Sequence, residues 1–290
     1  MLAPGTLKGQ VAIVTGGGTG IGLGIAREIG RLGGIVVLAS RNPEHLVSAV
    51  EELKRDGIEA AFHATDVRDP EQVEELVAST LERFEQIDIL VNNAAGNFIV
   101  DADKLSVNGF NAVVGIVLHG TFHCTRAAGL EMIRSGRGGK ILNLVAAYAW
   151  TGGPKTLHSA VAKAGVVAMT RTLAVEWAQH GIRVNALCPG PVDTEMSRAQ
   201  LWAAPEIRDQ LLRSVPVGRF GSVEEVAQAA SYLVSPYADF VNGEVLVVDG
   251  GEWLGKGCVW QEEWVPVRLH KREPGDHLGS GFGFGVRFGA

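Results

Sequence analysis

A strand, a glycine-rich turn and a helical pattern follow one another near the start of the chain. Residues 10–15 (QVAIVT) form a short apolar run typical of a buried parallel strand, and GGGTGIG follows at 16–22. Gly16 and Gly20 can adopt positive φ or let the backbone approach a ligand closely, and Gly22 lets the helix pack against the strand. Because the first N–H groups of such a helix point into the turn, the stretch predicts a pyrophosphate-binding site in a dinucleotide-binding domain.

The same alternation of strand and helix repeats along the chain. Apolar strands are predicted at residues 10–15, 35–39, 58–64, 87–91, 141–145, 182–187 and 245–248. Strand–helix units at this spacing predict an α/β fold of Rossmann type. We expect a doubly wound parallel sheet of about seven strands in the order 3-2-1-4-5-6-7, with helices on both faces.

The composition changes near the end of the chain. Residues 255–290 are rich in glycine and show no periodicity, whereas residues 195–213 have an amphipathic helical pattern. We expect a single catalytic domain over residues 1–254, including a substrate lid near 194–214, and then a glycine-rich tail over 255–290. The sequence leaves open whether the tail is mobile or lies across a neighbouring subunit.

The end of the second predicted strand bears on which dinucleotide is bound. An acidic residue there would accept hydrogen bonds from the adenine-ribose hydroxyls and favour NAD, but the chain has Ser40 and Arg41. A guanidinium is permanently charged and offers a fork of donors, so with the Ser40 hydroxyl it suits a 2′-phosphate. The two residues predict NADPH. The alternative is that Arg41 only begins a solvated helix.

The charge and the cysteines narrow the class of protein. The 290 residues carry a net charge of −6 with no run of Lys and Arg, which argues against a nucleic-acid partner. No apolar run approaches the roughly 18 residues that a membrane helix needs, and the N-terminus lacks the pattern of a signal peptide. Cys124, Cys188 and Cys258 are far apart and lack metal-binding spacing. We expect free thiols, no metal and a cytoplasmic location.

A helix with a central lysine follows the fifth predicted strand, within the stretch from Lys140 to Arg171. Together with the glycine turn, the NNAAG sequence at 92–96 and the Pro-Gly pair at 189–190, this stretch resembles the short-chain dehydrogenase/reductase family. That family usually carries Tyr-x-x-x-Lys on the helix. Lys163 is present here, but Ser159 stands where the tyrosine is usual.

Two further positions depart from the family's common pattern. Ala146 stands where a serine is usual, and Val117 stands where most members have an asparagine. The nearest phenol is Tyr148, just beyond the fifth predicted strand. Either the site is inactive or its acid has moved to Tyr148.

These departures are shared by one branch of the family. The sequence NNAAGNF at 92–98, the tyrosine after the fifth strand and Ser-x-x-x-Lys on the helix resemble NADPH-dependent 2,4-dienoyl-CoA reductases of the mitochondrial type, over about residues 7–253. The resemblance implies an acyl-CoA substrate, and a catalytic set of Asn97, Tyr148, Ser159 and Lys163. Its implied substrate contacts are Arg68, Phe98, Ser106 and Arg198. His158-Ser159 is also similar to peroxisomal 2-enoyl-CoA reductases, so the acyl chain is left open.

The resemblance also implies the extent of the NADPH site and a quaternary structure. Two helices predicted at 106–134 and 156–180 would form the interfaces of a homotetramer. The cofactor-binding residues would be Gly16, Thr19, Gly20, Ile21, Gly22, Ser40, Arg41, Asp66, Val67, Asn93, Ala94, Gly96, Lys163, Pro189, Gly190, Val192 and Thr194.

The expected chemistry is reduction of a conjugated thioester to a 3-enoyl-CoA. Tyr148 and Asn97 would donate hydrogen bonds to the thioester oxygen, and Lys163 at close range would lower the pKa of Tyr148. Two alternatives stay open. One is another acyl-CoA reductase, of the 2-enoyl or 3-oxoacyl type, on the same fold. The other is a catalytically silent NADP-binding protein.

Overall fold

The computed structural model describes residues 2–194, 197–198 and 205–255. The predicted tail lies outside them apart from Gly255, and so does part of the predicted lid. No helix in the described ranges is both long enough and apolar enough to cross a membrane.

Seven parallel strands form one sheet in the order β3-β2-β1-β4-β5-β6-β7, which confirms the predicted fold and strand order. The strands are β1 (Val11–Thr15), β2 (Ile35–Ser40), β3 (Ala60–Ala64), β4 (Ile89–Asn92), β5 (Gly139–Leu144), β6 (Ile182–Pro189) and β7 (Val245–Val248). The strand order reverses between β1 and β4. Strands β1 to β3 extend from that point toward one edge of the sheet, and strands β4 to β7 extend toward the other edge. In open α/β sheets, ligands bind at the carboxyl ends of the strands around such a reversal.

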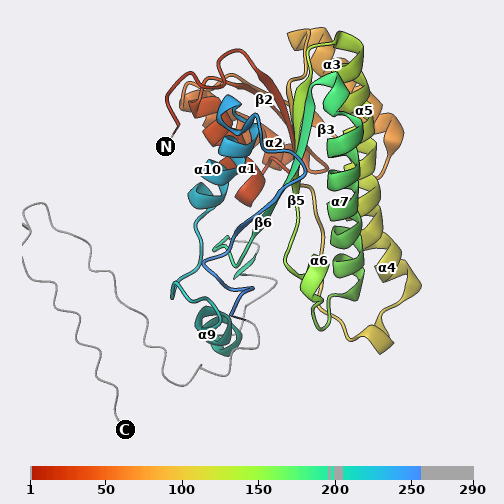
Figure 1. Ribbon diagram of the computed structural model, residues 1–290, viewed down its shortest axis with the longest axis vertical. Coiled ribbons are helices and arrows are strands. Elements are labelled where there is room, and N and C mark those ends of the chain that lie inside the picture. Colours follow the sequence, from red (N-terminus) through yellow and green to blue (C-terminus); the bar gives the residue numbers. More distant parts are fainter. Residues whose placement is uncertain (1, 195–196, 199–204, 256–290) are drawn as a thin grey trace, which may run out of the picture. The chain divides into compact units, whose positions relative to one another are not determined.

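Helices cover both faces of the sheet (Figure 1). One face carries α1 (Gly20–Arg31), α2 (Pro43–Arg55) and α10 (Val223–Val234). The other face carries α3 (Pro70–Phe84), α4 (Val107–Val114), α5 (Gly120–Ser135) and α7 (Leu157–Glu176).

Local sequence signals fix where several of these helices begin. Asn42 accepts a hydrogen bond from the backbone of Glu44 at the start of α2, and Asp69 accepts from Glu71 at the start of α3. Ser222 and Glu225 cap α10 reciprocally. Each such cap is worth about 1 kcal/mol, so the boundaries are encoded locally.

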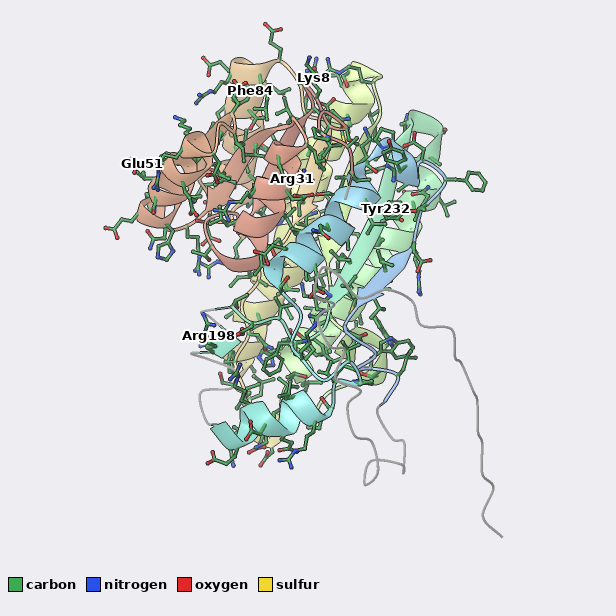
Figure 2. All side chains as sticks on the ribbon, turned by 90° about the vertical axis from the view of Figure 1, so that its left-hand side faces the viewer. Lys8, Arg31, Glu51, Phe84, Arg198 and Tyr232 are labelled. Carbon is green, nitrogen blue, oxygen red and sulfur yellow. The ribbon has the colours of Figure 1, made fainter. Side chains whose placement is uncertain are left out.

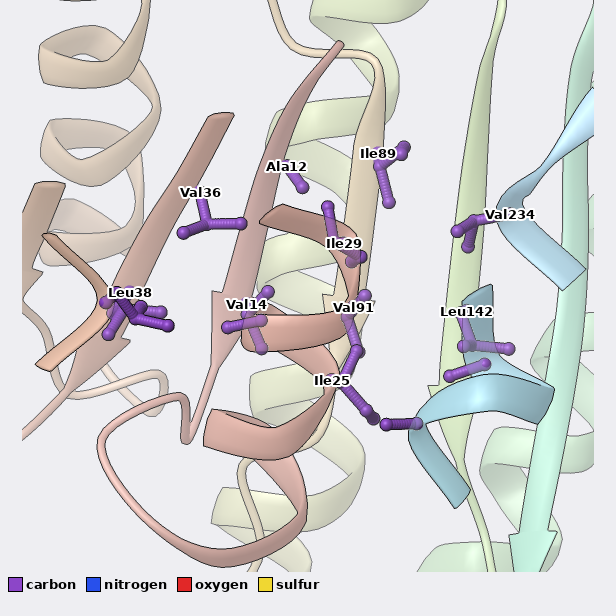
Figure 3. Packing of buried hydrophobic residues seen from close by; sticks show 14 of the residues in the cluster. Ala12, Val14, Ile25, Ile29, Val36, Leu38, Ile89, Val91, Leu142 and Val234 are labelled. Carbon is purple, nitrogen blue, oxygen red and sulfur yellow. The ribbon is translucent and has the colours of Figure 1, made fainter. Parts of the chain in front are cut away.

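The core lies on both sides of the sheet because successive strand residues point to opposite faces. Val14 of β1, Leu38 of β2 and Val91 of β4 pack with Ile25 and Ile29 of α1 (Figure 3). The intervening residues of the same strands pack against α3 and α5. Burial on both faces explains why the strands read as continuous apolar runs.

One element differs from the sequence prediction, and the structure defines two others more closely. The helix predicted at 106–134 is observed as α4 and α5 joined by a π-helical turn over Gly115–His119, and that turn contains Val117. Tyr148 does not lie in a loop but opens a short helix, α6 (Tyr148–Thr151). Within the described part of the lid, helix α9 spans Pro205–Arg213.

Candidate active site

The glycine turn after β1 is shaped to receive a phosphate. Gly16 and Gly20 both adopt positive φ, of 63° and 54°, where a side chain would be strained. A Cβ on Gly22 would lie 2.2 Å from the carbonyl oxygen of Gly16, so the helix can approach the turn this closely only with glycine there. Thr19 precedes α1 without a side-chain capping bond, and the first turn of α1, with Ile21, contains no acidic residue. The backbone N–H groups of this turn therefore suit an anion.

The end of β4 is tied to this turn. The Thr15 hydroxyl oxygen accepts hydrogen bonds of 3.0 Å from the backbone N–H groups of both Asn93 and Ala94. The Asn93 side chain donates to the carbonyl oxygens of Thr15 and Gly16, at 3.0 and 3.2 Å. Asn93 therefore holds the two strand ends together, a supporting position for a residue predicted to bind the cofactor. A Cβ on Gly96 would lie 3.1 Å from the Ile116 side chain.

Charged residues gather at the ends of β2 and β3. Asp66 accepts hydrogen bonds of 2.9 and 3.0 Å from the Arg68 guanidinium, and these hold the pKa of Asp66 below its usual range against the effect of partial burial. The charge of Arg41 acts in the same direction, which places Arg41 close to Asp66. A Cβ on Gly18 would lie 3.6 Å from the Ser40 hydroxyl, so Ser40 borders the glycine turn. Arg68, predicted to contact substrate, is bound to Asp66 in this structure.

The segment after β6 borders the same turn from the other side. Gly190 donates a backbone hydrogen bond of 2.9 Å to Val248, and a Cβ there would lie 2.5 Å from the Asp249 side chain. The methyl group of Thr194 is 3.9 Å from the position that a Cβ on Gly20 would take. Thr194 therefore lies at the glycine turn. Pro189 ends β6, and Val192 is buried. The backbone of Val67, in contrast, accepts a hydrogen bond from His123 and packs against α5.

The Tyr148 hydroxyl reaches helix α7. The Tyr148 hydroxyl is 2.9 Å from the Ser159 hydroxyl, which closes a hydrogen bond between α6 and α7. Ser159 itself is buried. The phenol of Tyr148, which follows β5, thus contacts Ser159, the position at which most members of the family have their tyrosine.

Lys163 lies one turn further along α7. Its ammonium group donates a hydrogen bond to the carbonyl oxygen of Leu144, the last residue of β5. Burial lowers the pKa of Lys163 to about 8, and Cys188 opposes this shift. Lys163 is therefore largely charged at pH 7 but poised to lose its proton just above.

The expectation that Lys163 lowers the pKa of Tyr148 is wrong for this structure. Burial raises the pKa of Tyr148, the hydrogen bond with Ser159 opposes that effect, and Cys188 adds to it. The physical reason is that burial penalises the phenolate more than the hydrogen bond with Ser159 favours it. Tyr148 is consequently a neutral phenol at pH 7, a state in which it can donate a hydrogen bond.

Asn97 and Phe98 leave β4 toward the same region. The Asn97 side-chain oxygen accepts a hydrogen bond of 2.9 Å from the Phe98 backbone N–H, so the amide group is left with its N–H donors to offer. The Phe98 ring stacks on His158 with ring centroids 4.4 Å apart. Phe98 therefore lies against the start of α7, and Asn97 directly precedes it.

The two remaining predicted substrate contacts are engaged elsewhere. The Ser106 hydroxyl accepts a hydrogen bond of 3.0 Å from Gly109 and caps α4. Arg198 is exposed (Figure 2) and forms an ion pair of 3.2 Å with Asp193. Asp193 also pairs with Arg208 of α9 at 3.8 Å.

Sequence reasoning missed two participants at this site. Cys188 influences the pKa of both Lys163 and Tyr148, yet in the sequence it is only a cysteine before the Pro-Gly pair. Asp193 could have been noticed as an acid directly before Thr194, but its ion pairs with Arg198 and with Arg208 of α9 depend on how this segment folds. Only tertiary structure supplies these contacts.

Comparison with known proteins places the chain among reductases. The sequence model of the family described as Enoyl-(Acyl carrier protein) reductase matches residues 16–252. A Bacillus subtilis (strain 168) protein named probable 2,4-dienoyl-CoA reductase, (2E)-enoyl-CoA-producing, is 41% identical over 249 residues, which are 86% of this chain and 98% of the relative. The peroxisomal 2,4-dienoyl-CoA reductase of Danio rerio, named as (3E)-enoyl-CoA-producing, is 40% identical over 253 residues, 87% of this chain and 84% of the relative.

Solved structures agree with the fold and point to a nucleotide. A crystal structure of a short chain dehydrogenase from Bacillus anthracis matches with a TM-score of 0.77 at 44% identity, over 85% of this chain and 97% of that one. A gluconate 5-dehydrogenase from Burkholderia cenocepacia, in complex with NADP and tartrate, matches with a TM-score of 0.80 at 34% identity, over 84% of this chain and 95% of that one.

Proposed function

Because the chain belongs to the short-chain dehydrogenase/reductase family of oxidoreductases, we propose that it reduces 2,4-dienoyl-CoA thioesters with NADPH, in the degradation of unsaturated fatty acids. The observation that carries the proposal is the 2.9 Å hydrogen bond between Tyr148 and Ser159. This hydrogen bond supports Tyr148 as the acid of an active site, and not a catalytically silent protein. The curated relatives with dienoyl-CoA reductase names support the substrate class.

The residues present fit a dinucleotide. Gly16, Gly20 and Gly22 leave a turn that a Cβ would fill, next to Thr194, and they would hold the pyrophosphate. Ser40 and Arg41 would hold the 2′-phosphate, and Asp66 would lie beside the adenine. Lys163 would hold the nicotinamide ribose, and Pro189, Gly190 and Val192 would border the nicotinamide. When bound, NADPH supplies the hydride.

The chain's own residues would stabilise the charge that develops on the substrate. As a hydride arrives at Cδ of the dienoyl chain, the electron pairs shift toward the thioester oxygen, which becomes enolate-like. Neutral Tyr148 and the Asn97 amide would donate hydrogen bonds to that oxygen, each worth about 3–4 kcal/mol in such an arrangement. The raised pKa of Tyr148 suits this role, because a phenolate could not donate.

Proton delivery completes the reaction. Tyr148 would lead the transfer of a proton to Cα, which leaves the double bond between Cβ and Cγ and gives a 3-enoyl-CoA. The Ser159 hydroxyl, bonded to Tyr148, would position the phenol and relay to it a proton from solvent, which restores the neutral phenol. Arg68 and Arg198 are proposed to meet the CoA phosphates. Each would first have to exchange its present carboxylate partner, Asp66 or Asp193.

The cofactor preference gives one testable prediction. Arg41→Ala should weaken NADPH binding by about 10- to 100-fold, since a hydrogen-bonded charge pair contributes about 1.5–3 kcal/mol. NADH binding should change little because it lacks the 2′-phosphate. Titration of both cofactors by fluorescence checks this, with the exposed Arg55→Ala on α2 as the matched control. An equal loss for NADH and NADPH would mean that Arg41 does not contact the 2′-phosphate.

The surfaces of the long helices support a homotetramer. Large apolar side chains are exposed on α5 (Phe122 and Leu130) and on α7 (Val161 and Val175), and the exposed fraction of Val175 reaches 80%. Exposed apolar surface of this kind marks interaction sites. We propose that residues 106–134 and 156–180 form the subunit interfaces of a cytoplasmic tetramer.

A panel of thioesters tests the proposed function. Purified protein with NADPH should consume it fastest with a 2,4-dienoyl-CoA, more slowly with a 2-enoyl-CoA and least with a 3-oxoacyl-CoA. Preference for either of the last two would assign the chain to another acyl-CoA reductase. Binding of NADPH without oxidation by any of the three would favour a silent NADP-binding protein.

A further inference from the structure

His158 is a buried imidazole without a hydrogen bond of good geometry among the described residues. It is the second residue of α7 and directly precedes Ser159. Its exposed fraction is 0%, and neither ring nitrogen has a hydrogen-bond partner of good geometry among the described residues. Burial lowers the pKa of His158, an effect that the nearby Phe98 backbone partly opposes, so the ring is neutral at pH 7. An unpaired buried polar group costs about 1–3 kcal/mol, so its nitrogens do not serve stability.

The contact that His158 does make is with the Phe98 ring. The two ring centroids lie 4.4 Å apart, with the planes tilted by 46°. Near the same ring lies Gly109 of α4, where a Cβ would come within 3.0 Å of Phe98 Cζ. Phe98, which is 40% exposed, therefore contacts an aromatic residue of α7 and lies beside a glycine of α4.

The position of Phe98 determines how Asn97 is presented. The Phe98 backbone N–H donates to the Asn97 side-chain oxygen at 2.9 Å, so the orientation of the Asn97 amide follows the placement of Phe98. Two other ties join this segment to the start of α7. Val100 donates to the Lys155 carbonyl oxygen at 3.1 Å, and Asp101 pairs with Lys155 at 3.5 Å. Both ties act on residues further from Asn97 than Phe98 is.

We propose that His158 is a positioning residue whose ring, together with the close approach of Gly109, holds Phe98 in place and thereby keeps the Asn97 amide in register with the Tyr148–Ser159 pair. Both proposed oxyanion donors would then be held from adjacent residues of one helix, His158 and Ser159. This role rests on the proposed function, because Asn97 matters only if a substrate oxygen is held there. The imidazole acts through its shape and not through its nitrogens.

Four variants test this role: His158→Ala, His158→Phe, Gly109→Ala and the double variant of His158→Ala with Gly109→Ala. His158→Ala should lower kcat/KM for the thioester by about 10²-fold, the scale of a misplacement near 1 Å, and leave the Kd for NADPH unchanged. His158→Phe keeps a ring and should restore most of the activity, with a Tm no lower than that of wild type. A purely structural role of His158 would move the Tm without this split between thioester turnover and NADPH binding.

Gly109→Ala would place a methyl group close to Cζ of the same Phe98 ring. It should lower kcat/KM by crowding Phe98, and in the double variant the two losses should not multiply, because the space left by His158→Ala accommodates the displaced ring. Multiplying losses, or a His158→Phe variant as inactive as His158→Ala, would overturn the proposal. If wild type reduces no thioester, the proposed function fails instead. Coupling of the two changes in the free energy of unfolding then still decides whether His158 and Gly109 hold Phe98 together.

Discussion

Tyr148→Phe should reduce turnover of acyl-CoA by about 10³-fold or more, because it removes both an oxyanion donor and the proposed proton donor. The phenol is half-buried, and its hydroxyl group is bonded to Ser159 within the site. Phenylalanine fills the same space, so the fold and the NADPH site should be preserved. The measurement is kcat with a dienoyl-CoA together with the Kd for NADPH, which should be unchanged.

Tyr237→Phe is the matched control for this change. Tyr237 is 66% exposed in the turn after α10, and its replacement should leave kcat at the wild-type value. Ser159→Ala should lie between the two, since it removes only the hydroxyl partner of Tyr148. Near-full activity of Tyr148→Phe would mean that the acid has not moved to the strand end.

Lys163→Met should abolish turnover and, unlike Tyr148→Phe, also weaken NADPH binding. The ammonium group is buried between α7 and the end of β5, where it would hold the nicotinamide ribose. Kd for NADPH and kcat measured on the same preparation separate the two variants. Lys54→Met, an exposed lysine of α2, is the control and should change neither. Unchanged NADPH binding in Lys163→Met would remove Lys163 from the cofactor site.

The pKa of Lys163 adds a dependence on pH to this prediction. The value of about 8 lies below the ordinary 10.5, so the amine loses its charge as pH rises through 8 in the folded protein. In wild type, kcat/KM for NADPH, which reports groups of the free enzyme, should fall above that pH. The unfolded chain binds this proton more tightly than the folded protein does. Below pH 8 the buried charge therefore lowers the free energy of unfolding by its full amount, and this cost disappears as pH rises toward 10.5. Lys163→Met should therefore have a Tm at pH 7 no lower than that of wild type.

The fold could be predicted because its signals are local and repeated. Each strand is a short apolar run buried on both faces, and the caps at Asn42, Asp69 and Ser222 mark helix starts within a few residues. Gly181 has a φ of 69° and ends the 3-10 turn Ala178–His180 that follows α7. The glycine turn is equally local, since positive φ at Gly16 and Gly20 is a property of the turn itself.

The candidate site was less predictable because its contacts join distant residues. No local pattern indicates that Lys163 engages the Leu144 carbonyl oxygen, or that burial of the phenol raises the pKa of Tyr148 instead of lowering it. The π-helical turn around Val117 and the stacking of Phe98 on His158 likewise depend on how α4 and α7 pack. Tyr148, Ser159 and Asn97 were found through the resemblance, and the hydrogen bond between Tyr148 and Ser159 is the first structural support for grouping them.

We propose that this site reduces a conjugated acyl-CoA by addition of hydride at Cδ and a proton at Cα. The most direct test is a reaction of a 2,4-dienoyl-CoA with NADPH that carries deuterium at the transferred position, followed by determination of the label and of the double bond in the product. We expect deuterium at Cδ and a double bond between Cβ and Cγ, as in relatives named (3E)-enoyl-CoA-producing. A double bond left between Cα and Cβ, as the name of the Bacillus subtilis relative states for its product, would contradict proton delivery to Cα. The absence of label from the product would contradict the reduction itself.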